Sequence, residues 1–119
     1  MNLADLITQI KEHPDYSKAG MILCHNGVVR ETSRNGKKVS GLRVAVDHEK
    51  LKQIIENAKK ETGIIEILVE IAEDRDLSVG EDVMLLVVAG DIRKHVIATL
   101  ENTLNRIKTI VTTKTEYFI

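Results

Sequence analysis

Hydrophobic residues recur along this chain at two spacings, and each spacing predicts one kind of element. Apolar residues three or four positions apart indicate the buried face of a helix. This spacing occurs over residues 3–12, 48–62 and 91–110. Pro14 stops the first of these segments, and Gly63 follows the second, where glycine commonly ends a helix. The pattern therefore predicts three helices.

Apolar runs and alternation predict strands between and after these helices. Within residues 64–72, every second position from 65 to 71 is apolar, and the positions between them are Glu66, Leu68 and Glu70. This alternation is typical of a half-solvated strand. Residues 82–90 are almost continuously apolar, as expected of a central strand. Gly27, inside the first strand, indicates a bulge or a close backbone approach. The predicted strands are residues 19–30, 39–46, 64–72, 82–90 and 112–119.

Three polar positions predict how these elements begin or connect. Asn35-Gly36 lies between the first two strands and predicts a hairpin, because both residues tolerate positive φ. Asp47 and Asp91 precede the second and third helices, so each is a candidate N-cap. We expect Asp47 to cap the helix that begins at His48.

The order of elements is α-β-β-α-β-β-α-β, which predicts the α+β class. Strands joined by short connections alternate with helices, so we expect a mixed, mostly antiparallel sheet with helices packed on one side of it. No repeat, low-complexity tract or linker divides the chain. We therefore expect residues 1–119 to form a single domain.

Composition and charge exclude several classes of protein. Seventeen basic and eighteen acidic residues give a net charge of −1, which provides no general field for nucleic acid. Base stacking needs exposed aromatic residues, and the chain has only Tyr16, Tyr117 and Phe118. The single cysteine, Cys24, forms no internal disulfide. We expect no nucleic-acid partner.

The sequence also predicts no membrane partner, no metal and no bound cofactor. No run approaches the ~20 apolar residues of a membrane span, and residues 1–10 do not resemble a signal peptide. We therefore expect the cytoplasm as its location. The four histidines show no metal-ligand spacing, and no phosphate-binding or dinucleotide-binding glycine motif occurs.

Four cations are the candidate functional residues: Arg30, Arg93, Lys108 and Lys114. Arg93 opens the last helix, where the positive end of the helix dipole disfavours a cation unless an anion binds nearby. Arg93 and Lys108 are about 22 Å apart along one helix. They can share a small site only across a dimer interface. Taken singly, each of the four is better explained as a solvated surface charge.

Five segments, in the same order as here, resemble conserved elements of the molybdopterin synthase large (catalytic) subunit. The first resembles that family's opening strand with its Gly-x-Val-Arg ending, and the last two resemble its two lysine-containing elements. The five segments are Ala19–Arg30 (AGMILCHNGVVR), Leu77–Val83 (LSVGEDV), Ala89–Arg93 (AGDIR), Asn105–Thr109 (NRIKT) and Lys114–Glu116 (KTE).

The resemblance implies a fold, a reaction and a role for each cation. In that family a homodimer of large subunits binds two ubiquitin-like small subunits, giving a heterotetramer. Sulfur passes from the thiocarboxylated tail of the small subunit to cyclic pyranopterin monophosphate, forming molybdopterin. The resemblance implies that Lys108 and Lys114 are catalytic, that Arg30 binds substrate, and that Arg93 binds substrate from the partner subunit.

Some positions depart from the family pattern and leave two other hypotheses open. His25 stands where the family has an aromatic residue, and Ile92 stands where it has histidine. The first alternative is a catalytically weak relative that binds the pterin, another anion or the protein partner. The second is a small-molecule sensor that binds another anion, such as a nucleotide, and is unrelated to the pterin pathway.

Overall fold

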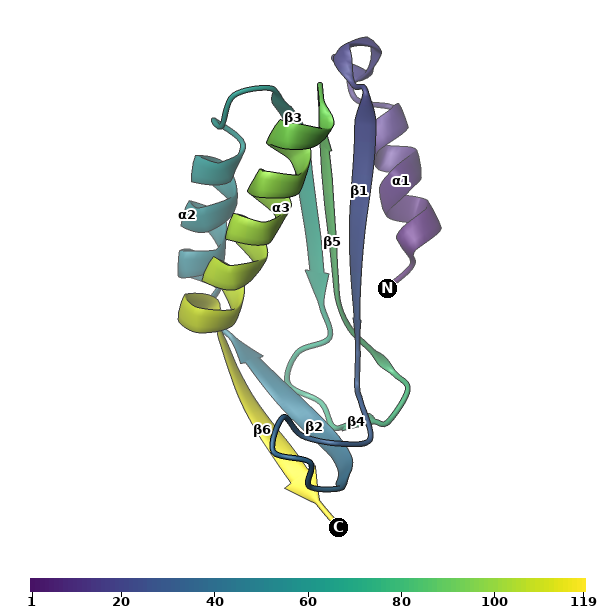
Figure 1. Ribbon diagram of the computed structural model, residues 1–119, viewed down its shortest axis with the longest axis vertical. Helices are drawn as coiled ribbons and strands as arrows, with labels where there is room; N and C mark the ends of the chain where they lie inside the picture. The colour runs from purple at the N-terminus through teal and green to yellow at the C-terminus, as the bar shows by residue number, and fades with distance from the viewer.

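Two small antiparallel sheets follow one another along the length of the molecule, whose extents are 48 × 25 × 23 Å (Figure 1). The computed structural model describes residues 1–119. In chain order the elements are α1 (Leu3–Lys11), a 3₁₀ turn (Tyr16–Lys18), β1 (Met21–Val28), β2 (Val39–Val46), α2 (His48–Ala58), β3 (Ile64–Ile71), β4 (Leu77–Ser78), β5 (Asp82–Gly90), α3 (Arg93–Arg106), a π-helical turn (Ile107–Val111) and β6 (Thr112–Phe118).

The larger sheet has the strand order β1-β5-β3, so the almost continuously apolar β5 is its central strand, as predicted. Alternate side chains of β5 face opposite sides. Met84, Leu86 and Val88 pack against α2 and α3, whereas Leu85 and Val87 pack against α1. Both faces of β5 are therefore buried, and this strand joins two separate hydrophobic clusters.

The smaller sheet has the strand order β4-β2-β6 and adjoins the end of the larger one. Leu42 and Val44 of β2 and Leu77 of β4 form a third hydrophobic cluster with Val29 and Ala72, which directly follow β1 and β3 of the larger sheet. Because Val29 and Ala72 are buried against β2 and β4, the two sheets share a packed junction. This junction is where the candidate site lies.

Several element boundaries confirm the sequence analysis. β2 and β5 span residues 39–46 and 82–90, as predicted. The Asp47 side chain accepts a hydrogen bond from the Lys50 N–H at 3.1 Å, so Asp47 is the N-cap of α2. The register between β1 and β5 shifts at Gly27, which confirms the predicted irregularity. No helix is both long and apolar enough to span a membrane.

The predicted hairpin between the first two strands is wrong. Gly36 does have a positive φ of 78°, but only a single bridge, Thr32 to Lys38, joins the segments on its two sides. β1 pairs with β5 instead, and β2 pairs with β4 and β6. Gly36 therefore has the predicted backbone conformation, but long-range pairing decides which strands are neighbours.

Three other expectations also need correction. The helices do not all lie on one side, because α1 covers the face of the larger sheet opposite to α2 and α3 (Figure 1). Asp91 is not the N-cap of α3: that position is Ile92, which has no capping side chain. The α2 helix ends at Ala58, and α3 ends at Arg106, where the backbone widens into the π-helical turn.

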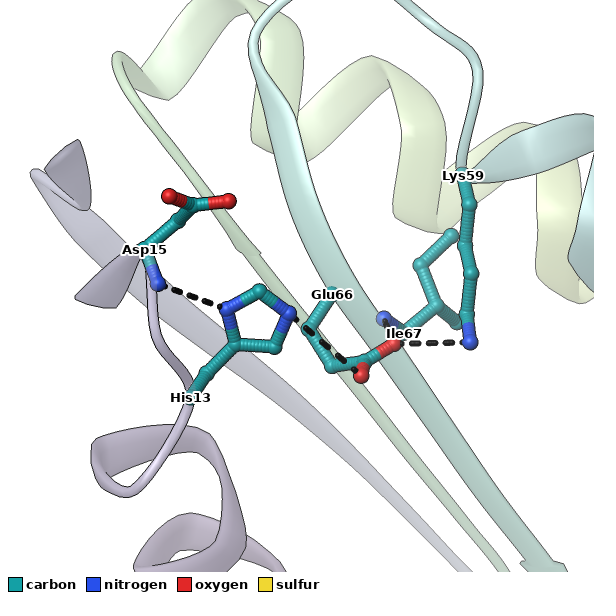
Figure 2. Close-up of polar contacts among 5 residues, drawn as sticks. All are labelled: His13, Asp15, Lys59, Glu66 and Ile67. Atoms are coloured by element: carbon teal, nitrogen blue, oxygen red, sulfur yellow. Dashed lines mark hydrogen bonds and ion pairs between the residues drawn. The ribbon is translucent and has the colours of Figure 1, made fainter.

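Glu66 lies in β3, in which every residue except the buried Ile67 is partly exposed (Figure 2). Its side chain is 20% exposed, and its carboxylate lies 3.8 Å from His13 Nε2 and 2.8 Å from Lys59 Nζ. The same carboxylate accepts the Ile67 N–H, and His13 Nδ1 accepts the Asp15 N–H at 3.0 Å. Glu66 thus connects the segments that follow α1 and α2 across the edge of β3.

Gly63 and Gly36 allow a matched test of packing, since φ is +77° at one and +78° at the other. A Cβ at Gly63 would collide with the Asp91 carboxylate and with His95, whereas a Cβ at Gly36 would meet nothing within 4 Å. We expect Gly36→Ala to lower the free energy of unfolding by about 1 kcal/mol through backbone strain. Gly63→Ala should cost about 1–3 kcal/mol more through overpacking. Urea unfolding of both variants measures this difference, and equal costs would contradict it.

Candidate functional site

A cavity of about 410 Å³ lies at the junction of the two sheets. Its walls include apolar residues of β2, β3 and β5, such as Val44, Ile71 and Met84. Its polar lining comes from β1, the loop that precedes β2, the π-helical turn and β6. These polar lining residues are His25, Arg34, Lys108, Thr109, Thr112 and Lys114. Elements far apart in the sequence therefore contribute to one cavity.

The cavity is basic, and no aspartate or glutamate is among the residues that line it. Arg34, Lys108 and Lys114 are three cations with a shared apolar wall. Like charges that share a partly enclosed space repel one another, and the repulsion is relieved when an anion binds among them. Arginine and lysine also give strong charge-assisted hydrogen bonds to phosphate and carboxylate groups. The lining therefore favours an anionic guest.

The π-helical turn positions Lys108. Ile107 and Val111, at its two ends, are 0% and 3% exposed and anchor the turn in the hydrophobic core. The hydroxyl of Thr109 donates to Asn105 O at 2.8 Å, and that of Thr112 donates to Ile107 O at 3.3 Å. Such single π turns occur frequently at functional sites. Between the two anchors, Lys108 remains exposed and lines the cavity.

Lys114 reaches the same cavity from β6. It is directly opposite Val44 of β2 in the antiparallel pair, so both side chains lie on one face of the smaller sheet. Its Nζ atom lies 3.9 Å from Glu116 Oε1, two residues along the same strand. Residues i and i+2 of a strand share a face, which allows Glu116 to lie beside Lys114.

His25 lines the cavity from β1, and its imidazole has an unusual environment. Its Nε2 atom is buried and has no hydrogen-bond partner. Burial lowers the pKa of His25 below its ordinary value, and the positive charge of Lys108 lowers that pKa further. Both effects favour the neutral form of the imidazole.

The structure brings together two of the four predicted site residues. Lys108 and Lys114 line the same cavity, although one belongs to a π-helical turn and the other to a strand. Arg30 is not among the lining residues, and its Nε donates to Thr32 O at 2.8 Å. Arg93 begins α3 and so lies at the opposite end of that helix from Lys108 (Figure 1). The roles of all four stay predictions.

Sequence reasoning missed Arg34 and His25. Arg34 belongs to the Ser33–Lys38 segment, which was considered only as a turn, yet its side chain lines the cavity. A signal was present, because Arg34 is one of three basic residues packed around the Asn35-Gly36 turn. His25 stands out in the sequence only as a departure from the resembled family, and the sequence gives no sign of its unpaired nitrogen.

A second and larger cavity, of about 540 Å³, lies between α2 and α3. Its lining mixes Glu61 with Lys94, His95 and Arg106, so it lacks the uniform positive charge of the first cavity. His95 Nδ1 is 2.8 Å from Asp91 Oδ1, and this hydrogen bond lowers the pKa of Asp91. No group of three or more His, Cys, Asp or Glu side chains is arranged to hold a metal ion.

Comparison with known proteins identifies both a family and a set of similar structures. The family model described as MoaE protein matches residues 1–110. An uncharacterised protein of Methanocaldococcus jannaschii is 36% identical over 95 residues, which are 76% of this chain and 79% of that protein.

Two solved structures of known proteins resemble this chain. Molybdopterin synthase from Staphylococcus aureus is 26% identical, with a TM-score of 0.73, and the match covers 86% of this chain and 77% of that chain. The complex of subunits 1 and 2 of molybdopterin-converting factor from Helicobacter pylori is 19% identical, with a TM-score of 0.72 and coverage of 99% and 84%. The second likeness shows the fold alone.

The basic cavity predicts anion binding that depends on its cations. We expect inorganic phosphate to bind wild-type protein and to bind Arg34→Gln or Lys108→Gln about tenfold more weakly, since one charge-assisted hydrogen bond is lost in each. Added sodium chloride should weaken binding in every case. Calorimetry measures these affinities. Lys52→Gln, on the exposed face of α2, is the control, and equal affinity for all four proteins would contradict the assignment.

Proposed function

Because this chain belongs to the MoaE protein family and has a role in molybdenum cofactor biosynthesis, we propose that it is a molybdopterin synthase large subunit that transfers sulfur to cyclic pyranopterin monophosphate. The observation that carries this proposal is the basic cavity, which contains both Lys108 and Lys114. The proposed substrate carries a phosphate, and the proposed sulfur donor ends in a thiocarboxylate. Both are anions, as the cavity lining requires.

In this proposal each cation has a role that follows from its chemistry. Arg34 and Lys108 hold the substrate phosphate, since a guanidinium binds phosphate through two parallel hydrogen bonds. Lys114 and Lys108 neutralise the tail of the sulfur donor. Lysine is also a residue type that serves as a general acid or base, so in this proposal either lysine exchanges a proton with the reacting groups. Arg30, two residues beyond the lining residue Val28, is proposed to assist substrate binding at the rim.

A small ubiquitin-like subunit is the proposed sulfur donor and protein partner. The Helicobacter pylori structure with the same fold is a complex of two different subunits, which supports a partner for this chain. The cavity lies at the surface junction of the two sheets, and an extended protein tail is narrow enough to enter such a space. We propose that the tail places its thiocarboxylate beside Lys108.

A second copy of this chain is the proposed source of Arg93. Within one chain, α3 separates Arg93 from the cavity, because the helix begins at Arg93 and the π-helical turn with Lys108 follows its far end. Arg93 has no salt-bridge partner of its own, and nor does Lys108. A homodimer that brings the start of one α3 to the cavity of its partner would complete the site.

Replacement of Lys108 tests the catalytic assignment. We expect Lys108→Ala to abolish formation of molybdopterin from thiocarboxylated small subunit and cyclic pyranopterin monophosphate. The free energy of unfolding should change by no more than about 0.5 kcal/mol, because the side chain is exposed. Lys52→Ala is the matched control and should keep full activity. Normal activity of Lys108→Ala would overturn the assignment, and a large loss of stability would mark Lys108 as structural.

A mixed dimer tests whether two chains share one site. When Arg93→Ala chains are paired with Lys108→Ala chains, one cavity keeps both native residues and the other loses both. We therefore expect the isolated mixed dimer to have about half of the wild-type activity, although each parent homodimer is impaired. Complete loss of activity in the mixed dimer would refute a shared site. Full activity of the Arg93→Ala homodimer would show that Arg93 is not needed.

A further inference from the structure

His25 is the polar group of the cavity that the proposed function leaves without a role. Two buried side-chain polar atoms in the structure have no hydrogen-bond partner, His25 Nε2 and Glu73 Oε2. The Glu73 carboxylate already pairs with His48 Nε2 through its other oxygen, at 2.7 Å. The His25 imidazole has no such pairing. Buried polar groups are nearly always hydrogen-bonded, so an unpaired one calls for a partner from outside the chain.

The position of His25 on β1 gives it access to that partner. Its side chain shares a face with Gly27, and both residues line the cavity. A Cβ at Gly27 would lie 3.2 Å from His25 Nε2, so the absence of a side chain at Gly27 leaves room for the imidazole. The ring therefore lies at the cavity wall, with Nε2 beside the position that a side chain at Gly27 would fill.

The charged groups around the cavity determine the form of His25. Lys108 from the π-helical turn, Lys114 from β6 and Arg34 from the loop all line the same space, and no carboxylate does. Partial burial and the positive charge of Lys108 favour a neutral imidazole. A neutral imidazole keeps one N–H donor and one acceptor nitrogen. It can therefore bind an anionic oxygen without adding a further positive charge to the cavity.

We propose that His25 is a substrate-contact residue: when an anion binds beside Lys108, the imidazole turns Nε2 into the cavity and donates a hydrogen bond to an oxygen of that anion. This inference rests on the proposed function, because it assigns a contact to the same substrate phosphate. It adds a neutral donor to the three cations of the site. It also makes the residue at position 25 a determinant of how tightly the phosphate end is held.

Histidine titration by NMR tests the contact without any turnover. In wild-type protein alone, His25 should titrate below the ordinary range of histidine. With saturating inorganic phosphate its pKa should rise, because a nearby negative charge favours imidazolium, and its Nε2 resonance should shift. His13, His48 and His95 lie outside the cavity and serve as internal controls. Phosphate that binds, as seen from Lys108 resonances, but leaves His25 unchanged would overturn the proposal.

Two substitutions separate hydrogen bonding from packing. His25→Phe fills the same wall without a donor, and we expect it to raise the KM for cyclic pyranopterin monophosphate about tenfold with little change in kcat. His25→Gln keeps an N–H donor and should recover part of that loss. An unchanged KM in His25→Phe would refute the contact. If His25→Phe does not fold, the NMR titration of wild-type protein decides alone.

The outcomes distinguish this inference from the proposed function. If wild-type protein and His25→Phe make molybdopterin with the same KM, the contact is refuted and the sulfur-transfer proposal stands. If His25 responds to phosphate but wild-type protein makes no molybdopterin, the sulfur-transfer proposal is refuted and the phosphate contact stands.

Discussion

Burial of β5 on both faces is the constraint on which the rest of the structure depends. A strand with Leu86 on one side and Val87 on the other, both fully buried, needs a helical layer on each side. That requirement places α2 and α3 over one face and α1 over the other (Figure 1). The α3 helix ends near the end of the larger sheet, and the π-helical turn then leads the chain into β6 of the smaller sheet. The turn and β6 both line the cavity, so the cavity lies where the chain passes from one sheet to the other.

The same packing explains how cations are held close together. Ile107 and Val111 contribute apolar burial that fixes the π-helical turn, and this turn holds Lys108 at the cavity. β6 then pairs with β2 along its length, which fixes Lys114 opposite Val44. Repulsion between the two ammonium groups is small compared with the free energy of burying these side chains. The fold can therefore tolerate a basic site in which only Lys114 has an acidic partner, and a bound anion stabilises this site.

Sequence reasoning succeeded where local pattern and burial agree. The limits of β2 and β5 follow from apolar runs, and Asp47 is a cap because its side chain acts on the next few residues only. It failed where distant segments decide. The turn at Gly36 has the expected backbone, but β2 pairs with β6, whose residues follow some seventy positions later in the chain. Arg34 lines the cavity and Arg30 does not. This difference depends on the path of the chain after β1, which periodicity does not predict. A π-helical turn at Ile107 breaks the 3.6-residue period and is likewise invisible to it.

In the proposed function a single chain lacks one cation of the site, and a second copy supplies it. Arg34, Lys108 and Lys114 line the cavity, but Arg93, the cation at the unfavourable end of a helix, lies far from them on the same chain. Exposed apolar residues such as Ile92, next to Arg93, and Ile110, near Lys108, occur at both ends of the α3 segment. If a second copy covers these residues, its α3 start and this chain's cavity approach each other for reasons of apolar burial alone. Substrate charge would then strengthen an association that hydrophobic contact has already favoured, and anion binding and dimerisation would be coupled.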